Sequence, residues 1–279
     1  MIIGIDASKT ALKQKTGIDN TAYQILLHLE QLDHKNSYLL YSNKPIDKSL
    51  KMNANFKEKL IPFPKFWSKF RLPLALLRDK PDKFLELTNA VPSFAPKKTA
   101  VFIHDLAFKF FPEAYSPFEL MLQESAIKIA VNKAERIFFS SEASKKDFLK
   151  FYKYPEKKIK IVPLAFDETI YKNSNKAQNV LNIDSPYFIF VGRLEKRKNI
   201  VRILDAFNKF KQKSKTNHKL VLAGKKGYGY NEIIDKINES SELKKDIIIT
   251  GYIDDKKLAN LYALSDGLIY PSLYEGFGL

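Results

Sequence analysis

Short apolar segments alternate with longer segments of helical periodicity along the whole chain, and this alternation constrains the fold most. In the first half, the predicted strands are residues 2–6, 37–42, 99–103, 136–140 and 158–162. In the second half, they are residues 187–191, 219–223, 246–250 and 267–270. Buried parallel strands read as continuous apolar runs, and they need crossover connections that are usually helices. The alternation therefore predicts βαβ units and an α/β fold with parallel sheets.

Helices are predicted between these strands, at residues 117–134, 141–152, 199–213, 230–240 and 255–264. Ser141 is a good N-cap residue and marks the start of the second of them. In the first, residues recur at helical spacing, which predicts one shared helix face made of Phe118, Met121, Leu122, Ser125 and Ile129.

The length of 279 residues suggests two domains, each able to bury its own core. A boundary is predicted within the stretch 163–185, which has proline near each end, a polar Asn/Ser cluster inside and little periodicity. We therefore expect an N-terminal domain at residues 1–165, a linker at 166–185 and a C-terminal domain at 186–279. Two open α/β sheets arranged in this way would bind ligands in a cleft, at the carboxyl ends of their strands.

Several kinds of site are excluded by composition. The absence of cysteine excludes disulfides, thiolate metal sites and a cysteine nucleophile. Four histidines lie too far apart in sequence for an HExxH zinc site: His28, His34, His104 and His218. No apolar run approaches the roughly 18 residues that span a bilayer, and no basic segment precedes the apolar N-terminus. We therefore expect a cytoplasmic protein.

The chain is strongly basic, with 47 Lys and Arg residues against 31 Asp and Glu residues and a formal net charge of +16. Only six of the basic residues are arginines, and the lysines are spread from end to end without an aromatic RNA-binding motif. This pattern argues against nucleic acid as the partner. It leaves an anionic membrane surface or an acidic acceptor open.

One segment, residues 61–81, mixes large apolar and basic side chains. Its apolar residues are Phe66, Trp67, Phe70, Leu74 and Leu77, interspersed with Lys65, Lys69, Arg71 and Arg78. The segment is either an amphipathic surface for an anionic membrane or an acceptor, or an ordinary helix packed on its sheet.

Two loops carry the chemistry. Residues 190–200 end a strand at Val191, turn at Gly192 and place four cations, Arg193, Lys196, Arg197 and Lys198, just before a helix. Cations and a glycine at a strand end before a helix N-terminus are typical of a phosphate site. Residues 265–279 run from a short strand into Glu275, whose carboxylate could accept hydrogen bonds from sugar hydroxyls. Each loop alone is equally compatible with a solvated turn.

Together, the ordered motifs resemble glycosyltransferase family 4. In the second half these are "GRLEKRKN", "LAGKKGYG" and "ITGYIDDKKLANLYALSDGLIYPSLYEGFGL". In the first half they are "IGIDAS", "TGIDNTAY", "VFIHDLAFKFFPEAYSP", "FFSSEASKKDF" and "IKIVPLAFDETIY". The resemblance covers essentially the whole chain. It implies the GT-B fold, in which two Rossmann-like domains face a cleft that holds a nucleotide-sugar.

The resemblance also implies roles for individual residues. Arg193 and Lys198 match the basic pair that holds the donor diphosphate, and Glu275 matches the first acid of the family's E-x7-E signature, near the donor sugar. His104 matches the histidine that faces the transferred sugar. The glycines and the aromatic residue expected close to the donor are Gly17, Gly192, Gly276, Phe277 and Gly278.

Departures from the family pattern accompany this resemblance. Asp19 stands where the N-terminal loop usually has a second glycine, and Ala165 stands where many relatives have glycine. The second acid of the signature would follow eight positions after Glu275, beyond residue 279, so the resemblance implies a second domain that is cut short.

The expected activity is transfer of a sugar, with retention at the anomeric carbon, from a UDP- or GDP-sugar to a glycan or a lipid-linked acceptor. No Asp-x-Asp motif is present, so neither a metal ion nor a cofactor is expected. Two alternatives stay open: a non-catalytic module that binds an acceptor or an anionic surface, and a sugar-nucleotide epimerase. Peripheral contact with an anionic membrane on its cytoplasmic face is a further expectation.

Overall fold

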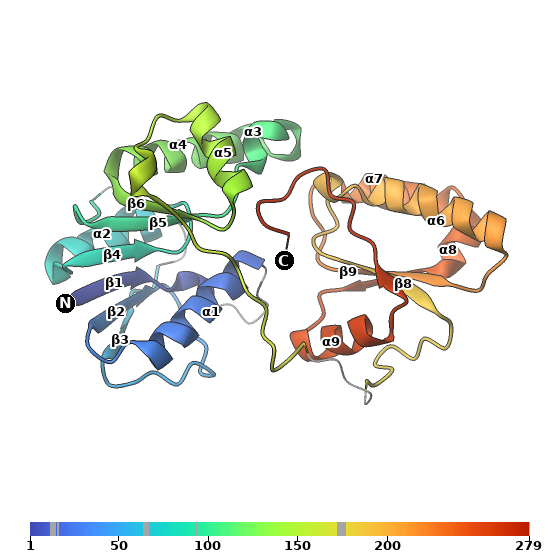
Figure 1. The fold of residues 1–279 in the computed structure, drawn as a ribbon, viewed down its shortest axis with the longest axis horizontal. Helices are drawn as coiled ribbons and strands as arrows, with labels where there is room; N and C mark the ends of the chain where they lie inside the picture. The colour runs from blue at the N-terminus through green and yellow to red at the C-terminus, as the bar shows by residue number, and fades with distance from the viewer. Residues whose placement is uncertain (12–14, 16, 64–66, 93, 172–176, 279) are drawn as a thin grey trace. The chain divides into compact units, whose positions relative to one another are not determined.

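The computed structural model describes residues 1–279 except 12–14, 16, 64–66, 93, 172–176 and 279. The chain divides into two compact units, described separately below (Figure 1). Unit 1 comprises Met1–Phe110, Ser116–Leu164 and Gly276–Leu279, and unit 2 comprises Phe111–Tyr115 and Ala165–Glu275. This division assigns Gly276–Leu279 to unit 1, whereas the sequence-based boundaries assign them to the C-terminal domain.

Unit 1 is built on a seven-stranded parallel sheet with the order β3-β2-β1-β4-β5-β6-β7. The strands are β1 (Ile2–Asp6), β2 (Ser37–Ser42), β3 (Phe56–Leu60), β4 (Lys83–Glu86), β5 (Thr99–Ile103), β6 (Ala134–Phe139) and β7 (Ile159–Ile161). The strand order reverses direction between β1 and β4. In open α/β sheets, this topological switch point is where ligands bind, outside the carboxyl ends of the strands.

Helices cover both faces of this sheet. They are α1 (Gly17–Leu32), α2 (Trp67–Asp79), α3 (Ala107–Phe110), α4 (Pro117–Lys133) and α5 (Glu142–Phe151), with 3-10 turns at Ser8–Ala11 and Glu156–Lys158. Leu26 of α1 packs with Leu40 of β2, whereas Leu72 and Leu76 of α2 pack with the next residue of β2, Tyr41. Because successive strand residues point to opposite faces, α1 and α2 lie on opposite sides of the sheet.

The N-caps of α4 and α5 explain where these helices begin. Ser116 and Glu119 form a capping box at α4, and Ser141 caps α5 as the sequence predicts. The predicted helix is confirmed as α4, but the face shared by Phe118 and Met121 is not its buried one: these side chains are 54% and 55% exposed, and the buried residues of α4 are Ile127 and Ala130.

Unit 2 has a four-stranded parallel sheet with the order β10-β9-β8-β11. Its strands are β8 (Tyr187–Val191), β9 (Lys219–Ala223), β10 (Ile247–Gly251) and β11 (Gly267–Leu268), and its helices are α6 (Ile200–Ser214), α7 (Tyr230–Asn238), α8 (Ser241–Asp246) and α9 (Asp255–Leu264). The 3-10 turns Pro112–Ala114 and Lys196–Lys198 also belong to this unit.

Unit 2 also buries both faces of its sheet. Leu204 of α6 and Ile233 of α7 pack with Leu222 of β9, whereas Leu261 of α9 packs with Val221 from the other face. The strand order reverses between β8 and β11, so this pair forms the switch point of unit 2. Among the described helices of the whole chain, none is long and apolar enough to cross a membrane.

Candidate active site

The loops that follow β8 and β9 pack closely against each other, and glycine residues allow this close approach. Gly192 and Gly224 both have φ angles in the region that favours glycine, +152° and +156°. A Cβ atom on Gly224 would lie 1.8 Å from the carbonyl oxygen of Gly192, so no larger residue fits. Beyond them, Leu194 donates its N–H to the carbonyl of Lys225 at 2.8 Å and accepts from the N–H of Gly227 at 3.0 Å. The two loops therefore form one hydrogen-bonded structure.

Lys198 is buried at the switch point of unit 2, with 7% of its surface exposed. Its ammonium donates to Oε1 of Glu275 at 2.5 Å and to the hydroxyl of Tyr270 at 2.8 Å. The ring of Tyr270 stacks on Phe190 at the end of β8, with ring centroids 5.5 Å apart. A buried ammonium is costly unless it is paired, and here a carboxylate and a phenol satisfy it. This contact joins the two loops to which the resemblance assigns the donor diphosphate and the donor sugar.

Glu275 carries its negative charge at neutral pH. Burial raises the pKa of its carboxyl, but the hydrogen bond from Lys198 and the charges of Lys198 and Arg197 outweigh that effect, so the net pKa lies below the ordinary value. The guanidinium of Arg197 lies 3.6 Å from Oε2 of Glu275.

Arg197 was predicted only as one of the four clustered cations of the anion site and was given no individual role. Its guanidinium donates to the carbonyl of Tyr274 at 2.8 Å and to Oε1 of Glu195 at 2.8 Å. Its own carbonyl accepts the N–H of Leu273 at 2.9 Å. These bonds hold the loop 271–275 at the end of β11 and thereby position Glu275. The only signal in the sequence was its place among four cations within six residues.

Arg193 is the exposed cation of the same edge. In the part of the chain that the structure describes, its guanidinium has no hydrogen bond and no ion pair. It follows Gly192 directly and precedes the N-terminus of α6, whose first turn has no side-chain cap. Both an exposed guanidinium and the N–H groups of an uncapped helix N-terminus favour an anionic ligand.

His104 and Gly17 lie in unit 1. His104 follows β5, and its Nε2–H donates to the carbonyl of Leu87 at 3.0 Å. Burial lowers the pKa of its imidazole, which keeps the ring neutral at neutral pH. Gly17 begins α1, and a Cβ atom added there would have no neighbour within 4 Å, so packing does not demand glycine at this position.

Gly276 also lies in unit 1, where it packs against the residues that follow β5 and β6. Its carbonyl accepts hydrogen bonds from the hydroxyls of Ser144, at 3.0 Å, and Ser141. A Cβ atom on Gly276 would lie 2.4 Å from the carbonyl oxygen of His104, so only glycine fits. The next residues are exposed: Phe277 is 39% accessible, and Gly278 has a φ of +85°.

Two buried acids at the switch point of unit 1 were not predicted from the sequence. Asp6 ends β1 and Glu86 ends β4, each one residue beyond the paired Ile5 and Leu85. Glu86 is fully buried, and its Oε2 has no hydrogen-bond partner among the described residues. Burial, and then the charge of Asp6, raise the pKa of Glu86 well above its ordinary value; burial also raises the pKa of Asp6. The residue pattern along β1 and β4 does not predict that the side chains of Asp6 and Glu86 are buried.

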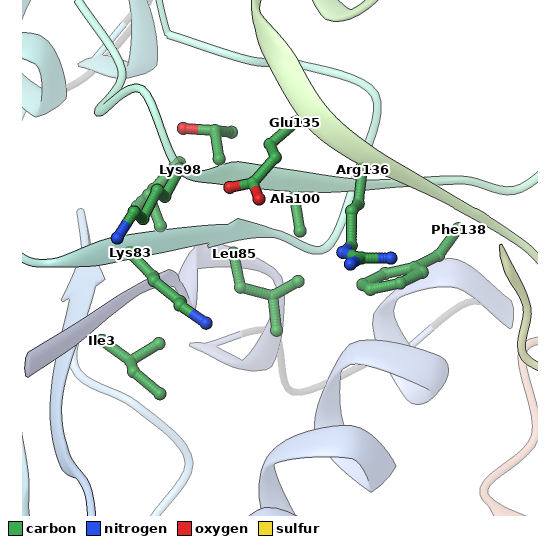
Figure 2. A pocket seen from close by; sticks show the side chains of 10 residues that line it. Ile3, Lys83, Leu85, Lys98, Ala100, Glu135, Arg136 and Phe138 are labelled. Carbon is green, nitrogen blue, oxygen red and sulfur yellow. The ribbon is translucent and has the colours of Figure 1, made fainter. Parts of the chain in front are cut away.

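A pocket of about 190 Å³ lies elsewhere, at the amino ends of the central strands of unit 1. Figure 2 shows the lining side chains of Leu85 and Ala100 between the charged side chains of Lys83 and Arg136, with Glu135 beside them. Since none of the predicted site residues lines it, this pocket is separate from the carboxyl ends of the strands. Among the described residues, no group of three or more His, Asp or Glu side chains is arranged to hold a metal ion.

Comparison with known proteins gives the fold a context. Residues 172–279 match the family "Glycosyl transferases group 1". Among curated relatives, the O-antigen chain mannosyltransferase B of Escherichia coli is 26% identical over 208 residues, which are 73% of this chain and 54% of that protein. The chain thus spans about half the length of this relative.

Solved structures resemble the whole chain. Sucrose-phosphate synthase from Thermosynechococcus elongatus superposes with a TM-score of 0.73 at 15% identity, over 100% of this chain and 77% of that one. HepE of Anabaena, in complex with UDP and glucose, superposes with a TM-score of 0.70 at 17% identity, over 99% of this chain and 75% of that one. The chain therefore has the α/β fold of the GT-B glycosyltransferases, and its residues 172–279 match the group 1 glycosyl transferase family.

Proposed function

We propose that the chain belongs to a retaining glycosyltransferase of family 4, which moves a hexosyl group from a nucleoside diphosphate sugar to a glycan or lipid-linked acceptor. The observation that carries the proposal is the cluster at the switch point of unit 2. There the ammonium of Lys198 donates to Tyr270 and Glu275, and the guanidinium of Arg193 has no hydrogen bond or ion pair among the described residues. The match of residues 172–279 to a glycosyl transferase family and the fold shared with a UDP-bound protein support it.

The proposed roles follow from charge. Breaking the bond between the anomeric carbon and the phosphate oxygen leaves negative charge on the departing diphosphate. Arg193 and Lys198 stabilise that charge in a partly desolvated site, where electrostatic interactions are stronger than in water. The hydroxyl oxygen of the acceptor bonds to the anomeric carbon on the side from which the diphosphate leaves, and its proton passes to the leaving phosphate oxygen. The anomeric configuration is then retained, and no carboxylate nucleophile is required.

Glu275, Gly276, Phe277 and Gly278 form the proposed sugar-binding segment. The carboxylate of Glu275 accepts hydrogen bonds from sugar hydroxyls, and the glycines let backbone N–H groups approach the donor. For unit 1, His104 and Gly17 are the residues proposed to contact the donor. The neutral ring of His104 holds its proton on Nε2, so Nδ1 is left as an acceptor for a sugar hydroxyl.

The acceptor and the sugar are proposed from the curated relatives. The relative from Escherichia coli is named as an O-antigen chain mannosyltransferase, so mannose is the sugar to test first and a growing polysaccharide is the acceptor class to test first. The proposal keeps the cytoplasmic location expected from the sequence, which cell fractionation tests.

The decisive experiment combines binding and product analysis. UDP and GDP are titrated against the chain by calorimetry, and transfer from GDP-mannose and UDP-glucose is followed by NMR of the anomeric proton. We expect Arg193→Ala to abolish nucleotide binding and the matched control Arg202→Ala, an exposed arginine of α6, to leave it unchanged. A product with inverted configuration contradicts retention. Donor isomerisation without acceptor indicates an epimerase, and acceptor binding without any nucleotide effect indicates a non-catalytic module.

A further inference from the structure

Helix α2 has two apolar faces, of which only one is buried. Leu72, Ala75 and Leu76 pack with Tyr41 of β2 and Phe84 of β4 in one cluster of unit 1. The two interpretations of segment 61–81 therefore do not exclude each other: one face of the helix packs on the sheet, and the other remains to be explained. Phe66 and Lys65, which belonged to the predicted surface, lie outside the described residues.

The second face is an exposed stripe made of Phe70, Leu74 and Leu77, called the α2 stripe below. These side chains are 60%, 60% and 51% exposed. At about 100° per residue, they fall within roughly 60° of one another around the helix axis. Phe63, 36% exposed, lies beside the helix, where the guanidinium of Arg71 is 5.8 Å from its ring centroid.

Cations flank the α2 stripe on both sides. Around the helix, exposed Arg71 and Arg78 lie about 80–100° to one side of Phe70, and exposed Lys69 lies about 100° to the other. The single acid of α2, Asp79, does not offset them, because its side chain is only 10% exposed. It accepts from Arg78 at 2.9 Å and pairs with Lys59 at 3.4 Å. The exposed face is therefore apolar in the middle and positive along both edges.

We propose that α2 lies in the surface of an anionic lipid bilayer, with the α2 stripe among the acyl chains and Lys69, Arg71 and Arg78 at the headgroups. A helix with a few large apolar residues rimmed by Lys and Arg has the composition of an interfacial helix. Basic side chains next to a bilayer are attracted by anionic lipids, and the net charge of +16 adds attraction over a longer range. Cations on both edges and the absence of an exposed acid on α2 favour lipid headgroups over a protein groove. The proposal does not depend on the sugar-transfer reaction.

The test is sedimentation of the chain with vesicles of phosphatidylcholine alone, or with about one third phosphatidylglycerol. We expect binding to the anionic vesicles, decreasing with added salt. Leu74→Ser with Leu77→Ser should lower the partition coefficient about tenfold or more, since two apolar side chains no longer insert. The matched control is Phe118→Ser with Met121→Ser, an equally exposed apolar pair on α4, which should change it less than about twofold.

A second pair of variants separates charge from insertion. Arg71→Gln with Arg78→Gln should weaken binding to anionic vesicles about tenfold, whereas Arg202→Gln on α6 should have little effect. The emission of Trp67, the single tryptophan and the first residue of α2, verifies that each variant keeps the helix packed. The proposal is overturned if the chain sediments with neither vesicle, which leaves a protein as the partner of the stripe. It is equally overturned if the α2 variants bind as well as the α4 control.

Discussion

The ion pair between Lys198 and Glu275 makes a quantitative prediction about unit 2. Replacing Lys198 with Met keeps the length of the side chain but leaves the carboxylate of Glu275 without its closest partner. Replacing Glu275 with Gln removes the opposite charge and keeps the shape. The two single variants and the double variant form a cycle that isolates the energy of the pair.

The geometry sets the expected size of the coupling. Two unit charges 2.5 Å apart attract by about 7 kcal/mol at an effective dielectric constant near 20, which is an upper bound because both groups lose hydration. Exposed pairs contribute about 0–1 kcal/mol, and breaking a buried pair costs about 3–5 kcal/mol. The side chains here are 9% and 25% exposed, and Arg197 continues to attract Glu275 from 3.6 Å after Lys198 is lost. We therefore expect a coupling of about 2–3 kcal/mol.

Hydrogen exchange of β9 is the suitable assay, because the single tryptophan, Trp67, reports on unit 1 and not on unit 2. β9 lies between β10 and β8, so its amides exchange when unit 2 opens as a whole. The control cycle is Lys196→Met with Glu232→Gln, an ion pair at 3.2 Å between side chains that are 50% and 54% exposed. A coupling for Lys198 and Glu275 no larger than that of the control pair would refute the reasoning.

The same cycle predicts a dependence on pH. Because the folded state lowers the pKa of Glu275 below its unfolded value of 4.5, this group stabilises unit 2 above about pH 4.5 and ceases to do so as the pH falls through the lowered value. Glu275→Gln should therefore lose stability less steeply than the wild type in acid. Equal acid slopes in both proteins would contradict a lowered pKa.

Three further predictions concern buried and glycine positions. Burial raises the pKa of Glu86, so the wild type should lose stability as the pH rises above 4.5, and Glu86→Gln should not show this loss. At pH 7 the variant should be more stable than the wild type by about 1–3 kcal/mol, measured by urea unfolding followed by Trp67 emission. Gly224→Ala should destabilise unit 2 by about 3 kcal/mol or more in β9 exchange, because its Cβ overlaps the carbonyl of Gly192; no change would mean that the loops can separate freely. Gly17→Ala should stabilise α1 by about 0.5–1 kcal/mol in urea unfolding while weakening nucleotide-sugar binding, and unchanged binding would refute the proposed contact of Gly17 with the donor.

Much of the fold could be predicted from the sequence, because most strands are short runs of apolar residues. β1, β2, β5, β8 and β9 have the predicted bounds. Two strands were missed for different reasons. β3 (FKEKL) lies at the edge of the sheet, where polar residues are tolerated on both faces, and β4 (KFLE) has only four residues and ends in a buried acid. α1 was also missed, since its start reads as part of a glycine-containing loop motif.

Less of the site could be predicted. The motifs predict which loops carry the site, and the structure shows a contact between Lys198 and Glu275 that the sequence analysis did not predict. The role of Arg197 depends on hydrogen bonds with the backbone N–H of Leu273 and the backbone carbonyl of Tyr274. Bonds to backbone groups cannot be predicted from the side-chain types of the residues that make them. The inward orientation of Asp6 and Glu86 was equally invisible, because burial of a carboxylate contradicts the ordinary preference of acids for the surface.

The pairing of the loops after β8 and β9, together with the bonds from Arg197 to the loop after β11, has a consequence for transplanting specificity between relatives. If a graft replaced only residues 192–199, the new loop would have to pack against the unchanged glycines at 224–229 and bond to the unchanged backbone groups at 273–274. The smallest segment that can be exchanged with its geometry intact is the set of three loops taken together. Substitutions in any one of them should therefore be read as changes to all three.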